Sequence, residues 1–297
     1  MTPTPPARPA ASPKPLRGQR VLSLALNLPG PAALMRLHSM GARCTKLEGP
    51  GGDPMAHYKP GAYADMHAGV KQVKADLKTE AGQKKLHALL AQTDVLLTSF
   101  RPSALNKLGL GWKTLHKAYP ELNLIAIVGA PGARAEEPGH DLTYMADNGL
   151  VTGLDLPPSL FADMGGALMA SEATLQAVLL RQAKGTGVMF EVALSEAARW
   201  LALPRHWGLT LPEGSVGGAH AGYRIYPCKD GRVAVAALEP HFAAALCEAA
   251  QVPIKDLRTL FLPATHAAIA AFLAGQTRKQ LDKLAVARDI PLHTLPR

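Results

Sequence analysis

The sequence predicts an α/β fold, because short apolar segments with strand character alternate along the chain with segments of helical spacing. The apolar segments are continuous rather than interrupted by polar residues, which is typical of parallel strands buried on both faces of a sheet. A hairpin signal appears only toward the C-terminal end, at residues 223–237, with Asp230 and Gly231 at its turn. We therefore expect a large domain built on a parallel sheet, followed by a smaller α+β domain.

The large domain begins with a strand–turn–helix unit. We expect a strand at residues 21–26, then the sequence Pro-Gly-Pro at 29–31 and a helix at 32–40. A second strand is expected at residues 43–48. The turn after the first strand lacks the G-x-G-x-x-G pattern, so the domain is predicted to be Rossmann-like without binding NAD.

The alternation continues along the rest of the chain. The next expected elements are a strand at 73–77, a helix at about 80–91, a strand at 94–100, a helical stretch, a strand at 122–128, a long buried helix at 162–183 and a strand at 188–194. Helices near 241–250, 263–273 and 277–286 follow the hairpin. We place a disordered, basic, Pro-rich tail at 1–18, the large domain at 19–204 and the small domain at 205–297.

Charge and composition restrict the possible partners. The chain has 32 Lys and Arg against 23 Asp and Glu, a formal charge of +9, which should attract an anion such as nucleic acid or a polyphosphate cofactor. Only 5% of residues are aromatic and no nucleic-acid-binding motif is present, so no nucleic-acid partner is expected. No apolar run approaches membrane-spanning length, and the three cysteines lack metal-ligand spacing. We expect a cytoplasmic protein with reduced thiols, no metal site and no membrane partner.

Two short segments contain a candidate acid/base pair. His140 lies in G-H-D-L-T-Y at 139–144, and Asp163 lies in A-D-M-G-G at 162–166. Histidine and aspartate are residue types whose pKa values can be tuned to give and take protons near neutral pH. The alternative is structural: His140 would hydrogen-bond beside Asp141, and Asp163 would be the N-cap of the long helix.

The chain resembles the family III CoA-transferases and their relatives, the 2-methylacyl-CoA racemases. The matching segments, in family order, are 28–42, 46–54, 75–78, 94–111, 138–142, 162–166 and 237–242. The resemblance implies the family III CoA-transferase fold, an acyl-CoA substrate and no permanently bound cofactor, since coenzyme A enters as part of the thioester. It also implies a homodimer, possibly interlocked, in which a partner's small domain completes each active site.

The resemblance also assigns residues to CoA binding. They are Asp76, Leu77, Lys78, Arg101, Gly139, Asp141 and Tyr144. Lys and Arg side chains suit the pyrophosphate and 3′-phosphate of CoA because both give charge-assisted hydrogen bonds to phosphate oxygens. Asp141 and Tyr144 are expected to position the histidine and the CoA rather than to react.

Two chemistries are compatible with Asp163. In the transferases the matching aspartate is a nucleophile that forms an acyl-enzyme intermediate, whereas in the racemases it shares α-proton transfer with a histidine. His140 stands where transferases commonly carry tyrosine, and Glu239 matches a supporting glutamate of the racemases, so the resemblance favours racemisation by His140, Asp163 and Glu239. Acyl-CoA:carboxylate CoA transfer and non-catalytic CoA binding are the alternatives.

Four departures from the family pattern stand out. The sequence V-G-A-P-G-A at 128–133 lacks a usual side-chain donor near the thioester, and Gly49 stands where racemases often carry arginine. The segment 153–161 is shorter than usual. The sequence ends about where relatives continue, so we expect the C-terminal return segment to be missing.

Overall fold

The computed structural model describes residues 13–297, which divide between Ala202 and Leu203 into two compact units. The predicted disordered tail covers residues 1–18, of which residues 1–12 lie outside the described part of the chain. Residues 15–18 of the predicted tail form a turn in which Leu16 is buried. The backbone N–H of Leu16 donates to the carbonyl of Met40 at 3.0 Å, which fixes the turn to the first unit.

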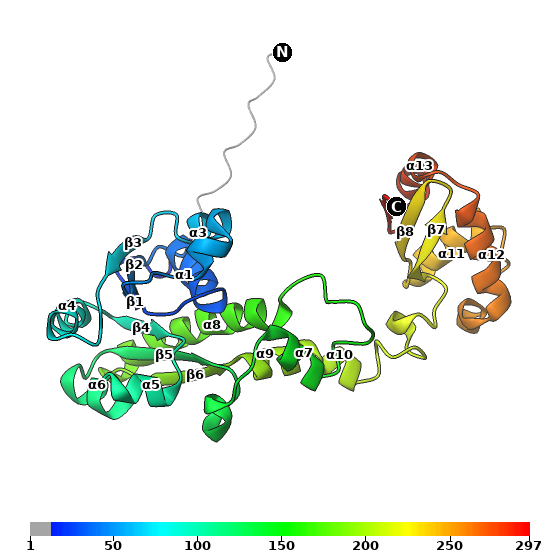
Figure 1. The fold of residues 1–297 in the computed structure, drawn as a ribbon. Coiled ribbons are helices and arrows are strands. Elements are labelled where there is room, and N and C mark those ends of the chain that lie inside the picture. Colours follow the sequence, from blue (N-terminus) through cyan, green and yellow to red (C-terminus); the bar gives the residue numbers. More distant parts are fainter. Residues whose placement is uncertain (1–12) are drawn as a thin grey trace, which may run out of the picture. The chain divides into compact units, whose positions relative to one another are not determined.

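A parallel sheet of six strands is the centre of the first unit (Figure 1). The strands are β1 (Arg20–Ser23), β2 (Arg43–Glu48), β3 (Lys71–Lys74), β4 (Val95–Thr98), β5 (Asn123–Val128) and β6 (Met189–Ala193). Their spatial order is β3-β2-β1-β4-β5-β6, and every neighbouring pair is parallel. The predicted α/β, Rossmann-like sheet is thereby confirmed.

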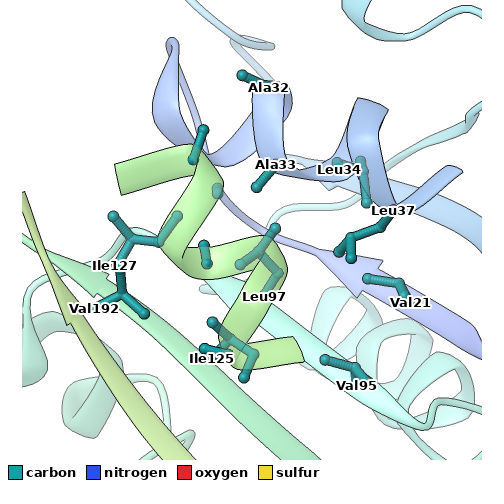
Figure 2. Close-up of a cluster of buried hydrophobic side chains, with 14 of the residues drawn as sticks. Val21, Ala32, Ala33, Leu34, Leu37, Val95, Leu97, Ile125, Ile127 and Val192 are labelled. Carbon is teal, nitrogen blue, oxygen red and sulfur yellow. The ribbon is translucent and has the colours of Figure 1, made fainter. Parts of the chain in front are cut away.

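Helices cover both faces of this sheet. Apolar residues of α1 (Pro29–Ser39) and α8 (Phe161–Lys184) pack on one face; Figure 2 shows Ala33, Leu34 and Leu37 of α1 beside strand residues such as Leu97. Leucines of α4 (Glu80–Leu90), α5 (Pro102–Lys107) and α6 (Trp112–Ala118) pack on the other face. The remaining helices of the unit are α2 (Met55–Tyr58), α3 (Pro60–Met66), η1 (Gly132–Glu136), α7 (Asp141–Asp147) and α9 (Leu194–Leu201).

The first helix starts earlier than the sequence predicted. Pro29, Gly30 and Pro31 form the first turn of α1 instead of preceding it. Proline fits there because the first N–H groups of a helix have no intrahelical acceptor. A Cβ on Gly30 would lie 2.1 Å from the Cβ of Ala25, so glycine lets the helix begin directly against the loop that follows β1.

The second unit contains an antiparallel sheet in the order β7-β8-β9, backed by helices. Its elements are α10 (Leu203–His206), η2 (Ser215–Gly217), β7 (Tyr223–Cys228), β8 (Gly231–Ala236), α11 (Pro240–Ala249), η3 (Leu257–Phe261), α12 (Pro263–Ala274), α13 (Arg278–Arg288) and β9 (Leu292–Leu295). The predicted hairpin is present, with Cys228 paired to Gly231. Strand β9 was not predicted, because its four residues carry no clear alternation.

Candidate active site

A cavity of about 200 Å³ lies outside the carboxyl ends of the central strands of the first unit. It is lined by residues that follow β1, β4 and β5, together with residues from the starts of α7 and α8. Parallel sheets commonly bind ligands at this edge, where the strand order reverses between β1 and β4. The lining residues are Leu26, Asn27, Pro29, Ser99, Phe100, Arg101, Ile127, Val128, Gly129, Ala135, Glu137, Gly139, His140, Tyr144, Asp163 and Leu194.

Asp163 lies in the first turn of α8 and is half-buried. The pKa of its carboxyl is raised to about 6, first by burial and then by the negative charge of Asp141, while His140 acts to lower it. The residue is not the N-cap of α8, because the helix begins at Phe161 after Leu160. Asp163 is therefore not the N-cap that the structural alternative predicted, and it lines the cavity.

Asp141 supplies the connection between the two predicted motifs. It is buried, and its Oδ1 accepts the backbone N–H of Asp163 at 2.9 Å. This bond satisfies one of the free N–H groups in the first turn of α8. The start of α7, which follows His140, is thereby joined to the start of α8, which carries Asp163.

His140 is exposed and lines the same cavity as Asp163. It immediately precedes α7, where its backbone N–H donates to Thr143 Oγ1 at 3.1 Å and its carbonyl accepts from the same hydroxyl at 2.8 Å. These two bonds fix the backbone of His140 at the helix start. The structure thus brings the two sequence-predicted catalytic residues to one cavity.

Tyr144 packs against the backbone of this site. A Cβ on Gly139 would lie 2.6 Å from its ring, and one on Gly129 would lie 2.2 Å from its hydroxyl oxygen. Both glycines therefore permit a close approach that a larger residue would block. Burial, followed by the charge of Asp163, raises the pKa of Tyr144.

A second cavity, of about 370 Å³, contains the other residues predicted to bind CoA. Asp76, Leu77 and Lys78 line it, whereas Arg101 lines the first cavity. Leu26 and Phe100 line both cavities, so the two spaces share a wall. The other residues around the second cavity are Leu24, Leu47, Gly49, Pro50 and Leu108.

Glu239 belongs to the second unit, where it is exposed and directly precedes α11. The supporting role in the active site that the resemblance assigns to Glu239 stays a prediction. Among residues 13–297, no group of three or more His, Cys, Asp or Glu side chains is arranged to hold a metal ion. Within the same range, no helix has both the length and the apolar character needed to cross a membrane.

Sequence reasoning missed several residues of the first cavity. Asn27 and Glu137 line it without belonging to a segment that we singled out, and Ser99 lies in the matching segment 94–111 but was given no role. Asn27 and Ser99 could have been found from topology alone, because each follows a strand at the carboxyl edge of a parallel sheet. Glu137 lies between η1 and α7 and had no such signal.

Comparisons with known proteins agree with this architecture. A cinnamoyl-CoA:phenyllactate CoA-transferase from Clostridium sporogenes is 33% identical over 200 residues, which are 60% of this chain and 48% of the relative. The mouse alpha-methylacyl-CoA racemase is 30% identical over 263 residues, which are 82% of this chain and 66% of the racemase. The chain spans about half the length of several curated relatives that it matches, with shares of 52%, 48% and 50%.

A solved structure shares the fold of most of the chain. It is a hypothetical protein from Mycobacterium tuberculosis, with a TM-score of 0.83, 26% identity, and coverage of 95% of this chain and 85% of that one. The sequence profile of CoA-transferase family III matches residues 16–296. The chain therefore belongs to CoA-transferase family III.

Proposed function

We propose that the first unit binds an acyl-CoA thioester across the two adjoining cavities. The CoA portion would occupy the second cavity near Lys78, and the thioester would lie in the first, beside His140 and Asp163. Two observations support this placement: the cavities share Leu26 and Phe100, and Arg101 adds a cation to the lining of the first cavity. Cationic side chains give charge-assisted hydrogen bonds to phosphate oxygens.

The reaction that we propose is epimerisation of a 2-methylacyl-CoA at its α-carbon. The observation that carries it is that His140 lines one cavity with Asp163, whose pKa is raised to about 6. A carboxylate with this pKa is a stronger base than an ordinary one and is still mostly ionised at neutral pH. Two proton carriers beside one substrate are what inversion at carbon requires.

The proposed steps transfer one proton off the substrate and one back. The Asp163 carboxylate takes the α-proton from one face, and the C–H electron pair moves into an enolate whose charge lies on the thioester oxygen. Protonated His140 then gives a proton to the α-carbon from the opposite face, which inverts it. The opposite enantiomer reacts in reverse, with neutral His140 as the base and protonated Asp163 as the acid.

CoA transfer is the second candidate. Within the described part of the chain, no hydrogen bond reaches the carboxylate oxygens of Asp163, so a lone pair is available to attack a thioester carbonyl and expel the CoA thiolate. Relatives that the chain matches carry the names of CoA-transferases as well as racemases. Non-catalytic CoA binding is the remaining alternative.

Deuterium incorporation separates these candidates. We expect the protein to incorporate solvent deuterium at the α-carbon of (S)-2-methylbutanoyl-CoA, measured by mass spectrometry. His140→Gln and Asp163→Asn should each reduce incorporation at least about 100-fold. Asp147→Asn is the matched control, because Asp147 is an exposed carboxylate at the other end of α7.

The other outcomes assign the alternatives. Exchange of CoA onto an added carboxylate, without deuterium incorporation, would show transfer through Asp163 instead of epimerisation. If neither reaction occurs but CoA raises the melting temperature, the chain binds CoA without catalysis.

We also propose that the chain forms a homodimer and that Glu239 supports the site. Support for the dimer comes from apolar side chains that the first unit leaves exposed along one face of α8, at Phe161, Met164 and Leu168. Residues three and four positions apart lie on the same helix face. Contiguous exposed apolar surface of this kind marks interaction sites.

A further inference from the structure

Asn27 has an unusual backbone conformation at the edge of the first cavity. Its φ angle is 62°, in the left-handed region that favours glycine. The other described non-glycine residues with positive φ are Gln251 and Asp289, and both lie in the second unit. Asparagine tolerates this conformation better than most residues, although glycine adopts it at lower cost. An amide side chain therefore stands at the cavity where a glycine would fit the backbone more easily.

A buried carboxylate holds this backbone. Both oxygens of Asp53, which is fully buried, accept the N–H of Asn27 at 3.2 Å. Asp53 Oδ1 also accepts the N–H of Met55 at 3.0 Å. Two main-chain segments, one after β1 and one at the start of α2, are thus tied to one side chain.

Lys46 neutralises this carboxylate. Its ammonium group is fully buried and forms an ion pair with Asp53 Oδ2, and it lies 3.5 Å from Glu48 Oε1. The Tyr63 hydroxyl donates to the same Glu48 oxygen at 2.6 Å. A buried ion pair is stable only when further hydrogen bonds satisfy its polar atoms, and both carboxylates here meet that condition.

We propose that the Asn27 amide donates a hydrogen bond to the thioester carbonyl oxygen of the substrate, and that Asp53 and Lys46 are positioning residues that hold Asn27 in place. This inference rests on the proposed function, because it assumes that a thioester occupies the first cavity. Both epimerisation and CoA transfer develop negative charge on that oxygen, as an enolate or as a tetrahedral intermediate. A preorganised amide donor stabilises either species.

One neighbouring segment of the cavity wall supplies no side-chain donor to the thioester oxygen. Residues 128–133, V-G-A-P-G-A, carry no side chain that can donate a hydrogen bond. The Ser99 hydroxyl oxygen accepts the N–H of Leu26 at 3.1 Å, which fixes the loop that carries Asn27. Within the described residues, no hydrogen bond engages the side-chain amide of Asn27, which is exposed at the cavity edge.

Asn27→Gly tests the contact, because it keeps the positive φ and removes only the amide. Turnover is followed in whichever assay the wild-type protein shows, and calorimetry compares the binding of 2-methylbutanoyl-CoA with that of its thioether analogue, which lacks the carbonyl oxygen. We expect kcat to fall about 100-fold, as for the loss of one oxyanion donor. The preference for thioester over thioether should disappear. Gln251→Gly makes the same change at a φ of 57° in the second unit and should alter neither quantity.

The outcomes separate this inference from the proposed function. Wild-type turnover and an intact thioester preference in Asn27→Gly would overturn the inference and leave the proposed function standing. A wild-type protein that binds neither compound would overturn both. The result that supports both is wild-type binding and turnover together with selective loss in Asn27→Gly.

A double-mutant cycle tests the positioning role. Asp53→Asn alone would remove the nearer of the two carboxylates that pair with the buried Lys46 ammonium, so Lys46→Met is combined with it to remove both charges of the Asp53–Lys46 pair. If the pair acts through Asn27, the double variant lowers kcat in the wild-type background but costs nothing further in Asn27→Gly. An equal fold-loss in both backgrounds would show a general structural role and overturn the assignment of the pair as positioning residues.

Discussion

At the residue scale, Asp163 carries its charge at a cost to the folded state. The pKa of its carboxyl is about 6 in the folded protein, against about 3.9 for an aspartate in an unfolded chain. The folded protein therefore binds this proton more tightly than the unfolded chain does. The contribution of Asp163 to the free energy of unfolding is least favourable above pH 6 and improves as the pH falls from 6 to 4.

Asp163→Asn should therefore stabilise the protein while abolishing its activity. At pH 8 we expect a gain of roughly 1 to 2 kcal/mol in the free energy of unfolding, with solvent screening at this half-buried site taken into account. At pH 4 the gain should vanish, because the wild-type carboxyl is then protonated in the folded state. Urea titrations of both proteins at the two pH values measure this, with Asp147→Asn as the exposed control. An equal gain at both pH values would contradict the explanation.

At the element scale, the start of α4 shapes the second cavity. The Thr79 hydroxyl accepts the N–H of Gly82 at 3.1 Å and donates to the carbonyl of Asp76 at 2.9 Å. The first interaction caps α4, and the second fixes the loop that contains Lys78. One side chain thus couples the stability of a helix to the shape of the predicted CoA loop.

Thr79→Ala should lower both stability and CoA affinity. Loss of an N-cap costs about 1 kcal/mol, and the freed loop should bind CoA several-fold more weakly. Thr277→Ala is the matched control, because Thr277 caps α13 in the second unit by accepting the N–H of Gln280 at 3.3 Å. It should cost similar stability without affecting CoA binding. Equal CoA affinities of the two variants, measured by calorimetry, would show that the α4 cap does not shape the CoA site.

At the scale of the whole molecule, the exposed apolar face of α8 bears on assembly. Leu168 is 51% exposed, and Trp200 of the neighbouring α9 is 68% exposed. A surface of this kind is costly in water unless another surface covers it. A second copy of the chain is the occupant that we propose.

Leu168→Asp should convert the proposed dimer to a monomer, because it places a charge in an apolar interface. Light scattering after size-exclusion chromatography gives the mass directly. Val286→Asp, at an 87% exposed site on α13, is the control and should leave the mass unchanged. If Leu168→Asp has the same mass as the wild-type protein, this face is not the interface.

Much of the first unit could be predicted from the sequence, because its elements are long or continuously apolar. The helix predicted at 162–183 is α8, and the sheet follows the expected parallel pattern. The hydrogen bond from Asp163 to Asp141 could not be predicted, since it joins residues 22 positions apart through a geometry that no local pattern encodes. The positive φ of Asn27 could not be predicted for a related reason. The side chain that holds this backbone is Asp53, which belongs to a different loop.

The wall that the two cavities share has a consequence for substrate choice. Because Leu26 and Phe100 face both spaces, a molecule that fills both would be bound at two linked points, and its second contact would form at a high effective concentration. A nucleotide fragment or a short thioester without its nucleotide would reach only one point and lose that advantage. Under the proposed function, bivalent binding of this kind would favour complete acyl-CoA molecules over small thioesters that lack the nucleotide.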